Sequence, residues 1–373
     1  MSDLSRRRWI QKSLLASSAM LVTVNSSALN AVIESNKNYD GPLLRLNWNE
    51  NPYGPSDKAK QAIIQALTGA NRYPDSLVGA LKEKLATVYS LQPKNFMLTA
   101  GSTEVLSLLG QHVGLQKGEI LTPWPSFPTL IMFGEQTGAS IRKVKLDNGD
   151  RINLERVKEA ISDKTKLIFI CNPNNPTSTE LDTGELRAFL KTVPSDVLVC
   201  VDEAYIEYSK YGVKSSVVDL ITELSNLVVC RTFSKAYGLA GLRIGYAISN
   251  EANIDALRNR HTGWELSAGV APVAGASATL DDPQFLDMVV ERNEEGKSIV
   301  TSAFDKWGLE YSKSSTNFIY AKSAGFHADI VDKMKENNIL ITKWPDMTEH
   351  IRISIGKPDE MEQFVKAVEQ YVA

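Results

Sequence analysis

The chain has 373 residues, which is long enough to bury the cores of two domains. Its 43% apolar and 23% charged residues are ordinary for a globular protein, and its formal net charge of −3 gives no reason to expect nucleic acid or an anionic membrane as a partner. The four histidines are scattered without metal-ligand spacing, so we predict no metal site.

The first 28 residues have the three-part layout of an export signal. A basic segment, residues 5–12, precedes a moderately apolar run at 14–24, and small residues follow at 26–28. The run is shorter than the about 20 apolar residues that span a bilayer, so we predict a cleaved signal and no permanent membrane span. Paired arginines after a serine resemble a twin-arginine signal, which predicts an exported, periplasmic protein. If the segment is only a basic start, the protein stays in the cytoplasm.

Exchanging both Arg6 and Arg7 for lysine tests the export signal, because the twin-arginine route requires the arginine pair. We expect the unsubstituted protein in the periplasm without its first 28 or so residues, and the substituted protein uncleaved and folded in the cytoplasm. Cell fractionation followed by immunoblotting measures both. An unaltered distribution would mean that the basic segment is not an export signal.

Beyond the signal, the sequence predicts an arm at residues 29–55 and then an α/β domain at 56–270. Ser56 is placed to cap a helix whose apolar residues recur at helical spacing. Farther on, helical stretches alternate with short apolar runs at 96–99, 119–122, 141–146, 167–170, 197–201, 227–230 and 245–248. Wholly apolar short strands are buried on both faces, which favours a mostly parallel central sheet. The three cysteines lie in or beside such runs, so we predict buried thiols and no disulfide framework.

The last hundred or so residues have a different pattern. A long amphipathic stretch leads to alternating short strands and helices; these elements are expected at 284–307, 318–321, 328–337, 339–341 and 350–355, with a helix at the C-terminus. This pattern predicts a smaller α+β domain at 271–373, which packs with the arm.

The most informative motif is TFSKAYGLAGLRIGY at residues 232–246. Lys235 closely follows an apolar run, and a desolvated lysine has a lowered pKa that makes its amine nucleophilic toward carbonyls. Thr232 and Arg243 can meet around one phosphate, because arginine binds phosphate oxygens through two parallel hydrogen bonds. A carbonyl compound with a phosphate tail, held covalently by a lysine, is pyridoxal phosphate. An isolated Ser-Lys pair is more often a surface lysine beside a turn, so this assignment needs partners elsewhere.

Two further motifs supply candidate partners. Gly101, Ser102 and Thr103 follow a strand and open a helix, where free backbone amides bind phosphate; the alternative is a plain capping box. Asp202 ends a buried strand, where a carboxylate needs a partner and would keep a pyridine nitrogen protonated. Tyr205 is placed to donate a hydrogen bond to the phenolic oxygen of the same ring. The alternative is that Asp202 caps the next helix.

In order and spacing, these motifs resemble class I/II pyridoxal-phosphate-dependent aminotransferases, most closely the histidinol-phosphate aminotransferase branch, from about residue 46 to the C-terminus. The resemblance implies a fold-type-I transferase with Lys235 holding pyridoxal 5′-phosphate and acting as general acid and base. It further implies that Asn175 hydrogen-bonds the cofactor and contacts the substrate, that Phe127 stacks on the cofactor ring, and that Arg352 binds the substrate carboxylate. For Asn175 the alternative is a simple Asn-Pro turn, and for Phe127 it is core packing.

The resemblance also implies a homodimer, because Tyr73 lies in a segment whose tyrosine reaches the cofactor phosphate of the neighbouring subunit. One departure affects the substrate: histidinol-phosphate aminotransferases usually carry a phosphate-binding arginine where this chain has Thr342 and Lys343. With Tyr53, Phe127 and Trp344 expected near the substrate, aromatic walls favour a neutral or aromatic amino donor.

The activity predicted from the sequence is therefore amino-group transfer from an L-amino acid to a 2-oxo acid, with small-molecule partners. Three alternatives remain: a histidinol-phosphate aminotransferase proper, a pyridoxal-dependent decarboxylase of amino-acid phosphates, and a non-catalytic exported binding protein. The intact pair of Lys235 and Asp202 argues against the last.

Overall fold

The computed structural model describes residues 43–261, 268–343 and 349–372. The predicted export signal, the first part of the predicted arm and Trp344 lie outside the described residues. Within those ranges, no helix is both long and apolar enough to cross a bilayer.

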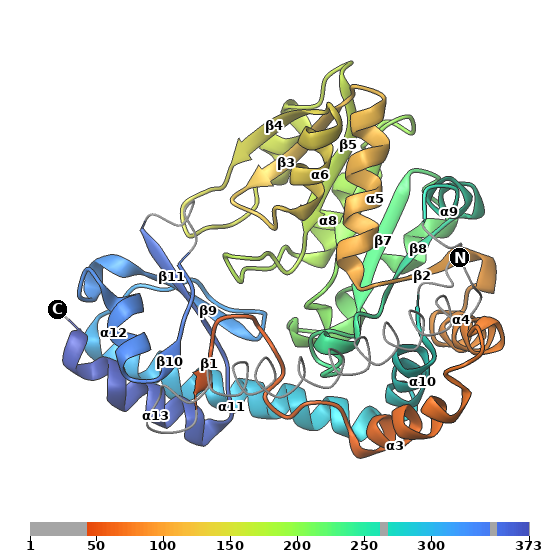
Figure 1. Cartoon of the computed structure of the whole chain (residues 1–373). Helices are drawn as coiled ribbons and strands as arrows, with labels where there is room; N and C mark the ends of the chain where they lie inside the picture. The colour runs from red at the N-terminus through yellow and green to blue at the C-terminus, as the bar shows by residue number, and fades with distance from the viewer. Residues whose placement is uncertain (1–42, 262–267, 344–348, 373) are drawn as a thin grey trace, which may run out of the picture.

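A seven-stranded sheet forms the centre of the larger part of the molecule (Figure 1). Its strand order is β2-β8-β7-β6-β5-β3-β4, and β8 is antiparallel to both of its neighbours while the other strands run parallel. The strands are β2 (Phe96–Thr99), β3 (Glu119–Trp124), β4 (Ser140–Lys145), β5 (Thr165–Cys171), β6 (Leu198–Asp202), β7 (Leu227–Thr232) and β8 (Gly245–Ser249). This confirms the α/β fold class, and each of the seven predicted runs forms a strand.

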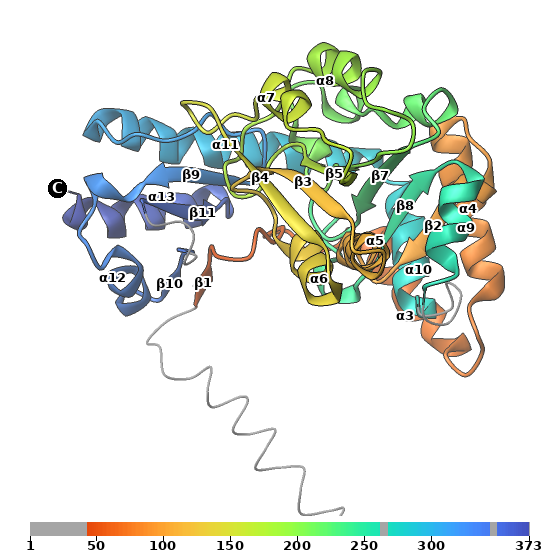
Figure 2. The same cartoon turned by 90° about the horizontal axis from the view of Figure 1, so that it is seen from above.

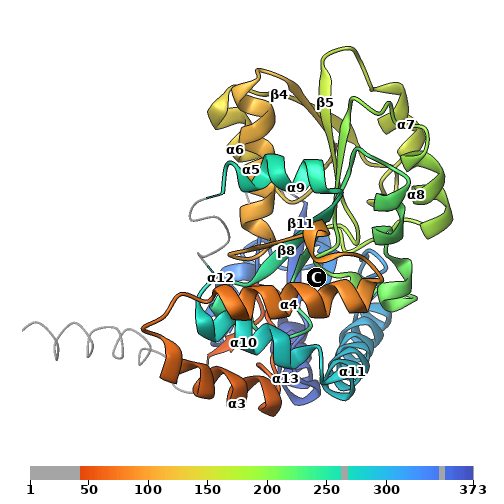
Figure 3. The same ribbon diagram turned by 90° about the vertical axis from the view of Figure 1, so that its right-hand side faces the viewer.

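Both faces of this sheet are buried, which explains why its central strands are apolar without alternation. Val199 and Val201 of β6 contribute to a core beneath α4 (Asp75–Tyr89), α7 (Leu154–Glu159), α8 (Thr183–Leu190) and α10 (Val270–Thr279). Cys200, between them, belongs to the opposite core beneath α5 (Ser102–Leu115), α6 (Thr129–Thr137) and α9 (Glu251–Arg258). Figure 3 shows α5 and α6 on one side of the sheet and α7 and α8 on the other. All three cysteines are free and buried, as predicted.

A smaller part of the molecule has its own apolar core. It contains β9 (Phe318–Lys322) paired antiparallel with β11 (His350–Ser354), and β1 (Leu44–Arg45) paired parallel with β10 (Ile339–Leu340). The helices α12 (Ile330–Glu336), α13 (Pro358–Val368) and the end of α11 (Pro283–Trp307) cover these strands (Figure 2). Because β1 belongs to the N-terminal arm and joins β10, the arm packs with the C-terminal segment.

The arm continues from β1 across the edge of the large sheet to α3 (Asp57–Ala66). Ser56 caps α3 as predicted, since its hydroxyl accepts a hydrogen bond from the backbone N–H of Ala59 at 3.2 Å. Before the cap, the chain makes a tight approach to the loop after β7. A Cβ on Gly238, whose φ is +71°, would lie 2.1 Å from the carbonyl oxygen of Gly54. Glycine at position 238 therefore permits the arm to lie directly over the loop that carries Lys235.

Candidate active site

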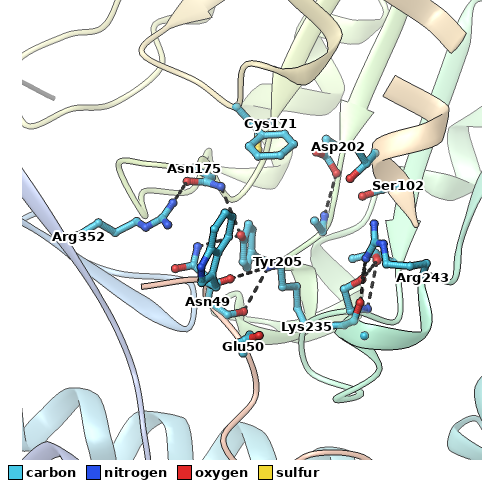
Figure 4. Close-up of a pocket in the computed structure, with 18 of the residues that line it drawn as sticks. Asn49, Glu50, Ser102, Cys171, Asn175, Asp202, Tyr205, Lys235, Arg243 and Arg352 are labelled. Atoms are coloured by element: carbon cyan, nitrogen blue, oxygen red, sulfur yellow. Dashed lines mark hydrogen bonds between the residues drawn. The ribbon is translucent and has the colours of Figure 1, made fainter. Parts of the chain in front are cut away.

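A cavity of about 410 Å³ lies where the carboxyl ends of β5, β6 and β7 meet the arm and β11. Ligands bind at this edge in α/β proteins, because loops from neighbouring parallel strands converge there. Ten of the lining residues are labelled in Figure 4: Asn49, Glu50, Ser102, Cys171, Asn175, Asp202, Tyr205, Lys235, Arg243 and Arg352. Thr103, Phe127 and Thr232 also line the cavity, so the structure brings most of the predicted site residues together.

Lys235 lies in the loop directly after β7, which fixes its backbone at the sheet edge. Its half-buried side chain donates hydrogen bonds to the carbonyl oxygens of Trp48 and Asn49, both at 3.3 Å. Burial, assisted by the positive charge of Arg352, lowers the pKa of the Lys235 amine from 10.5 to about 8. About a tenth of this amine is therefore uncharged at pH 7, far more than for an ordinary lysine, as a nucleophile or proton acceptor requires.

Asp202 is the last residue of β6 and is 2% exposed. The hydrogen bond that the structure gives its carboxylate comes from the backbone N–H of Ala204, at 3.2 Å. Burial raises the pKa of Asp202 to about 7. The alternative role as a helix cap does not match the structure, because Tyr205 is the N-cap of the short helix that follows. A buried carboxylate beside a cavity needs a positively charged partner, because one backbone hydrogen bond does little to stabilise its charge. A protonated ring nitrogen would be such a partner.

The first two residues of α5, Ser102 and Thr103, line the same cavity. Gly101 is the N-cap of α5 and has no side chain to cap it, so the alternative of a capping box on Ser102 or Thr103 is not formed; Glu104 accepts a hydrogen bond from the backbone N–H of Ala100 at 2.6 Å. A Cβ on Gly101, whose φ is +79°, would lie 2.5 Å from a guanidinium nitrogen of Arg243. Glycine is required here because it lets the arginine pack against the helix N-terminus.

Arg243 is held over this turn by three hydrogen bonds. Its guanidinium donates to the carbonyl oxygens of Ala100 and Ala240, at 3.2 and 3.0 Å, and to the hydroxyl of Ser234 at 3.2 Å. The Thr232 hydroxyl in turn donates to the Ser234 hydroxyl at 3.0 Å. Hydroxyls, a guanidinium and a helix N-terminus thus surround one end of the cavity, which is the donor set that a phosphate needs.

A hydrogen-bonded chain crosses the other end of the cavity (Figure 4). The Arg352 guanidinium donates to the Asn175 side-chain oxygen at 2.7 Å, and the Asn175 amide donates to the Tyr205 hydroxyl at 3.4 Å. The Asn49 side chain also donates to the Tyr205 hydroxyl, at 3.0 Å. Burial raises the pKa of Tyr205, so its hydroxyl stays protonated. Burial also lowers the pKa of Arg352 to about 10, which still leaves the guanidinium charged at neutral pH.

Three of the predicted site residues that the structure describes, Gly101, Tyr53 and Tyr73, do not line this cavity. Tyr53 lines a separate small cavity with Tyr208 and Val289, so its predicted contact with substrate has no support in the geometry. Tyr73 is 81% exposed. Its contact with the cofactor phosphate of a neighbouring subunit stays a prediction.

Sequence reasoning missed Asn49 and Ser234. Asn49 has a φ of +55° and connects the arm to Lys235, Tyr205 and Ser354, which are far away in the sequence. Its unusual backbone conformation leaves no sequence signal beyond the preference of asparagine for the left-handed region. Ser234 was recognisable, because it is a second hydroxyl residue of the same motif and directly precedes Lys235.

The donor set fits pyridoxal phosphate at each of its functional groups. The amine of Lys235 can hold the aldehyde, and the turn at Ser102 with Arg243 can bind the phosphate. Asp202 lies at a buried strand end that suits the ring nitrogen, and Tyr205 with Asn175 offers hydrogen bonds to the phenolic oxygen. These groups line a single cavity, so one ligand can satisfy all of them.

Comparisons with known proteins identify the family. A model of the family described as aminotransferase class I and II matches residues 42–368. Histidinol-phosphate aminotransferase 1 of Idiomarina loihiensis is 35% identical over 331 residues, which cover 88% of this chain and 89% of the relative. The aromatic amino acid aminotransferase of Mycolicibacterium smegmatis is 34% identical over 330 residues, with 88% and 90% covered.

A solved structure agrees with these relatives. Histidinol-phosphate aminotransferase from Sinorhizobium meliloti, in complex with pyridoxal-5′-phosphate, superimposes with a TM-score of 0.80 at 26% identity, covering 90% of this chain and 92% of that one. The chain belongs to the class I and II aminotransferases, within the histidinol-phosphate aminotransferase family. It has the fold-type-I aminotransferase fold, and its cofactor is pyridoxal 5′-phosphate.

Proposed function

We propose that this aminotransferase takes its amino group from histidinol phosphate and passes it to a 2-oxo acid. Similarity to histidinol-phosphate aminotransferases over 88% of the chain supports this donor. The geometric observation that carries the proposal is that Arg352 lines the same cavity as Lys235, so an anionic group and an amine can be held together. Histidinol phosphate offers both, with its phosphate one carbon away from the carbon that bears the amine.

Each residue of the site has a role in this reaction. Bound pyridoxal phosphate supplies an electron sink for the bond that breaks at the amine-bearing carbon. The Lys235 amine removes the proton from that carbon and returns a proton during the exchange, for which a pKa near 8 is suitable. Asp202 holds a proton on the ring nitrogen, while Tyr205 and Asn175 orient the ring through hydrogen bonds. Ser102, Thr232 and Arg243 anchor the phosphate of the cofactor.

A neutral or aromatic amino donor is the second candidate. The sequence favours it, because Thr342 and Lys343 replace the expected arginine, and the aromatic amino acid aminotransferase at 34% identity supports it as well. Of the three aromatic residues behind that expectation, Phe127 lines the cavity, Tyr53 lines a separate one, and Trp344 lies outside the described residues. The repeated similarity to histidinol-phosphate aminotransferases favours histidinol phosphate as the first candidate.

Comparing kcat/KM for histidinol phosphate and for phenylalanine, with 2-oxoglutarate as acceptor, tests the proposed donor. We expect a preference of at least tenfold for histidinol phosphate, which corresponds to about 1.4 kcal/mol in transition-state binding. A tenfold or greater preference for phenylalanine would replace the proposal with the aromatic donor. Release of carbon dioxide from an amino-acid phosphate would instead support the decarboxylase alternative.

We also propose that the protein forms a homodimer and that it is exported to the periplasm. A homodimer is supported by the exposed ring of Tyr73 and by the exposed apolar side chains of Ile64 and Leu67 nearby in the sequence. Export to the periplasm is supported by the residue pattern at positions 5–28. Sedimentation of the purified protein and the fractionation described above test them separately.

A further inference from the structure

Besides Arg243 and Arg352, a third arginine, Arg45, lines the cavity. Its neighbours Leu44 and Leu46 are buried in the core of the smaller part, so the alternation of side chains along a strand turns Arg45 away from that core. The Arg45 side chain is 57% exposed and pairs with the carboxylate of Glu50 at 3.1 Å. Glu50 lines the same cavity.

The strand register directs Arg45 and Arg352 to the same face. Arg45 pairs with Leu340 across β1 and β10, and Thr342 pairs with Arg352. Leu340 and Thr342 are two residues apart, and alternate residues of a strand share a face. The strand of Arg45 also bonds directly to β11, because the backbone N–H of Ser354 donates to the carbonyl oxygen of Leu46 at 2.9 Å, so the two arginines lie on neighbouring strands. Side chains of this length, both lining one cavity, can converge on a single anion.

The ion pair between Arg45 and Glu50 does not prevent such a contact. Both side chains are exposed to water, which screens their attraction, so the pair is easily exchanged for another partner. A phosphate dianion is a better partner than one carboxylate, because it carries more charge and accepts two parallel hydrogen bonds from a guanidinium. Glu50 is 38% exposed and therefore remains hydrated when Arg45 binds a phosphate in its place.

We propose that Arg45 is a specificity-determining residue that binds the phosphate of the amino donor jointly with Arg352. The inference rests on the proposed function, since it assumes a phosphorylated donor. In sequence position, Lys343 replaces the phosphate-binding arginine of the family, and the inference gives phosphate binding to Arg45 instead. Lys343 is exposed and is absent from the described residues that line the cavity.

The test compares histidinol phosphate with L-histidinol, which is the same molecule without the phosphate. The wild-type enzyme should prefer histidinol phosphate strongly in kcat/KM. Replacing Arg45 by methionine keeps much of the side-chain length and removes the charge. We expect Arg45→Met to reduce the preference for histidinol phosphate at least tenfold, mainly by raising KM, and Arg45→Lys to restore part of it. Cofactor absorbance and melting temperature should stay near wild type, because Arg45 is exposed.

Two control variants make the test specific. Lys343→Met removes an exposed positive charge outside the cavity and should leave the preference unchanged. In Arg45→Met the carboxylate of Glu50 loses its partner and could itself repel the phosphate. Adding Glu50→Gln removes that charge, and we expect the reduced preference for histidinol phosphate to persist in the double variant. Full recovery in the double variant, or a Lys343→Met loss with an unaffected Arg45→Met enzyme, would overturn the role of Arg45. A wild-type enzyme that does not prefer histidinol phosphate over L-histidinol would contradict the proposed function itself, and this inference with it.

Discussion

Replacing Lys235 with alanine is expected to lower turnover at least about a thousandfold, because the variant loses both the covalent hold on the cofactor and the positioned acid and base. The purified variant should also lose the visible absorbance of covalently held pyridoxal phosphate. The structure supports this large effect, since the amine is half buried, has a pKa lowered to about 8 and lines the same cavity as Asp202. Steady-state kinetics and an absorption spectrum measure the two outcomes.

A lysine outside the site provides the matched control. Lys94 is exposed and pairs with Glu251 at 2.9 Å, away from the cavity residues. Lys94→Ala should keep normal colour and rate. If Lys235→Ala behaves in the same way, Lys235 is not the lysine that holds the cofactor.

Replacing Asp202 with asparagine is expected to slow proton removal by about a hundredfold or more, the usual size of effect when a fixed electrostatic contact to the reacting centre is lost. Asparagine has the same shape but cannot hold a proton on the ring nitrogen, so the ring accepts electrons poorly. The cofactor should remain bound, since Lys235 and Arg243 are untouched. Single-turnover kinetics with the best donor measure the step. An unchanged rate would make Asp202 a structural residue.

The cofactor-free protein offers a second measurement on Asp202. Burial raises the pKa of this carboxyl from 3.8 to about 7. A raised pKa means that the protonated form stabilises the fold fully below pH 3.8, and that this stabilisation is lost as the pH rises through about 7. Between pH 5 and pH 8, the melting temperature of the wild-type apoprotein should therefore fall more than that of Asp202→Asn. Parallel curves would show that Asp202 titrates elsewhere.

The strands of the central sheet were the easiest elements to predict, because a strand that is buried on both faces consists of apolar residues. Val199 and Cys200 of β6 face opposite cores, so the strand is apolar throughout and could be recognised. Asp202 and Thr232 end neighbouring parallel strands, which bring their ends to one edge, so their proximity also followed from the pattern.

The arm could not be predicted in the same way, because its contacts depend on the whole fold. Asn49 meets Tyr205 and Ser354, which are 156 and 305 residues away in the sequence. Tyr53 is only four residues from Asn49 in the sequence, but the chain turns between Asn49 and Tyr53. The side chain of Asn51 accepts a hydrogen bond from the backbone N–H of Tyr53 at 2.9 Å, and its carbonyl accepts one from Gly54 at 3.2 Å. That turn directs Tyr53 into another cavity.

Reduction of the purified protein with borohydride, followed by proteolysis and mass spectrometry, tests most directly that Lys235 holds pyridoxal phosphate. Borohydride makes the bond between a lysine and the cofactor permanent, so the modified residue can be located in a peptide. We predict a pyridoxyl phosphate group on the peptide that contains Lys235, lost in Lys235→Ala and retained in Asp202→Asn. A protein that carries the group on another lysine, or that binds no pyridoxal phosphate when supplied with it, would contradict the account.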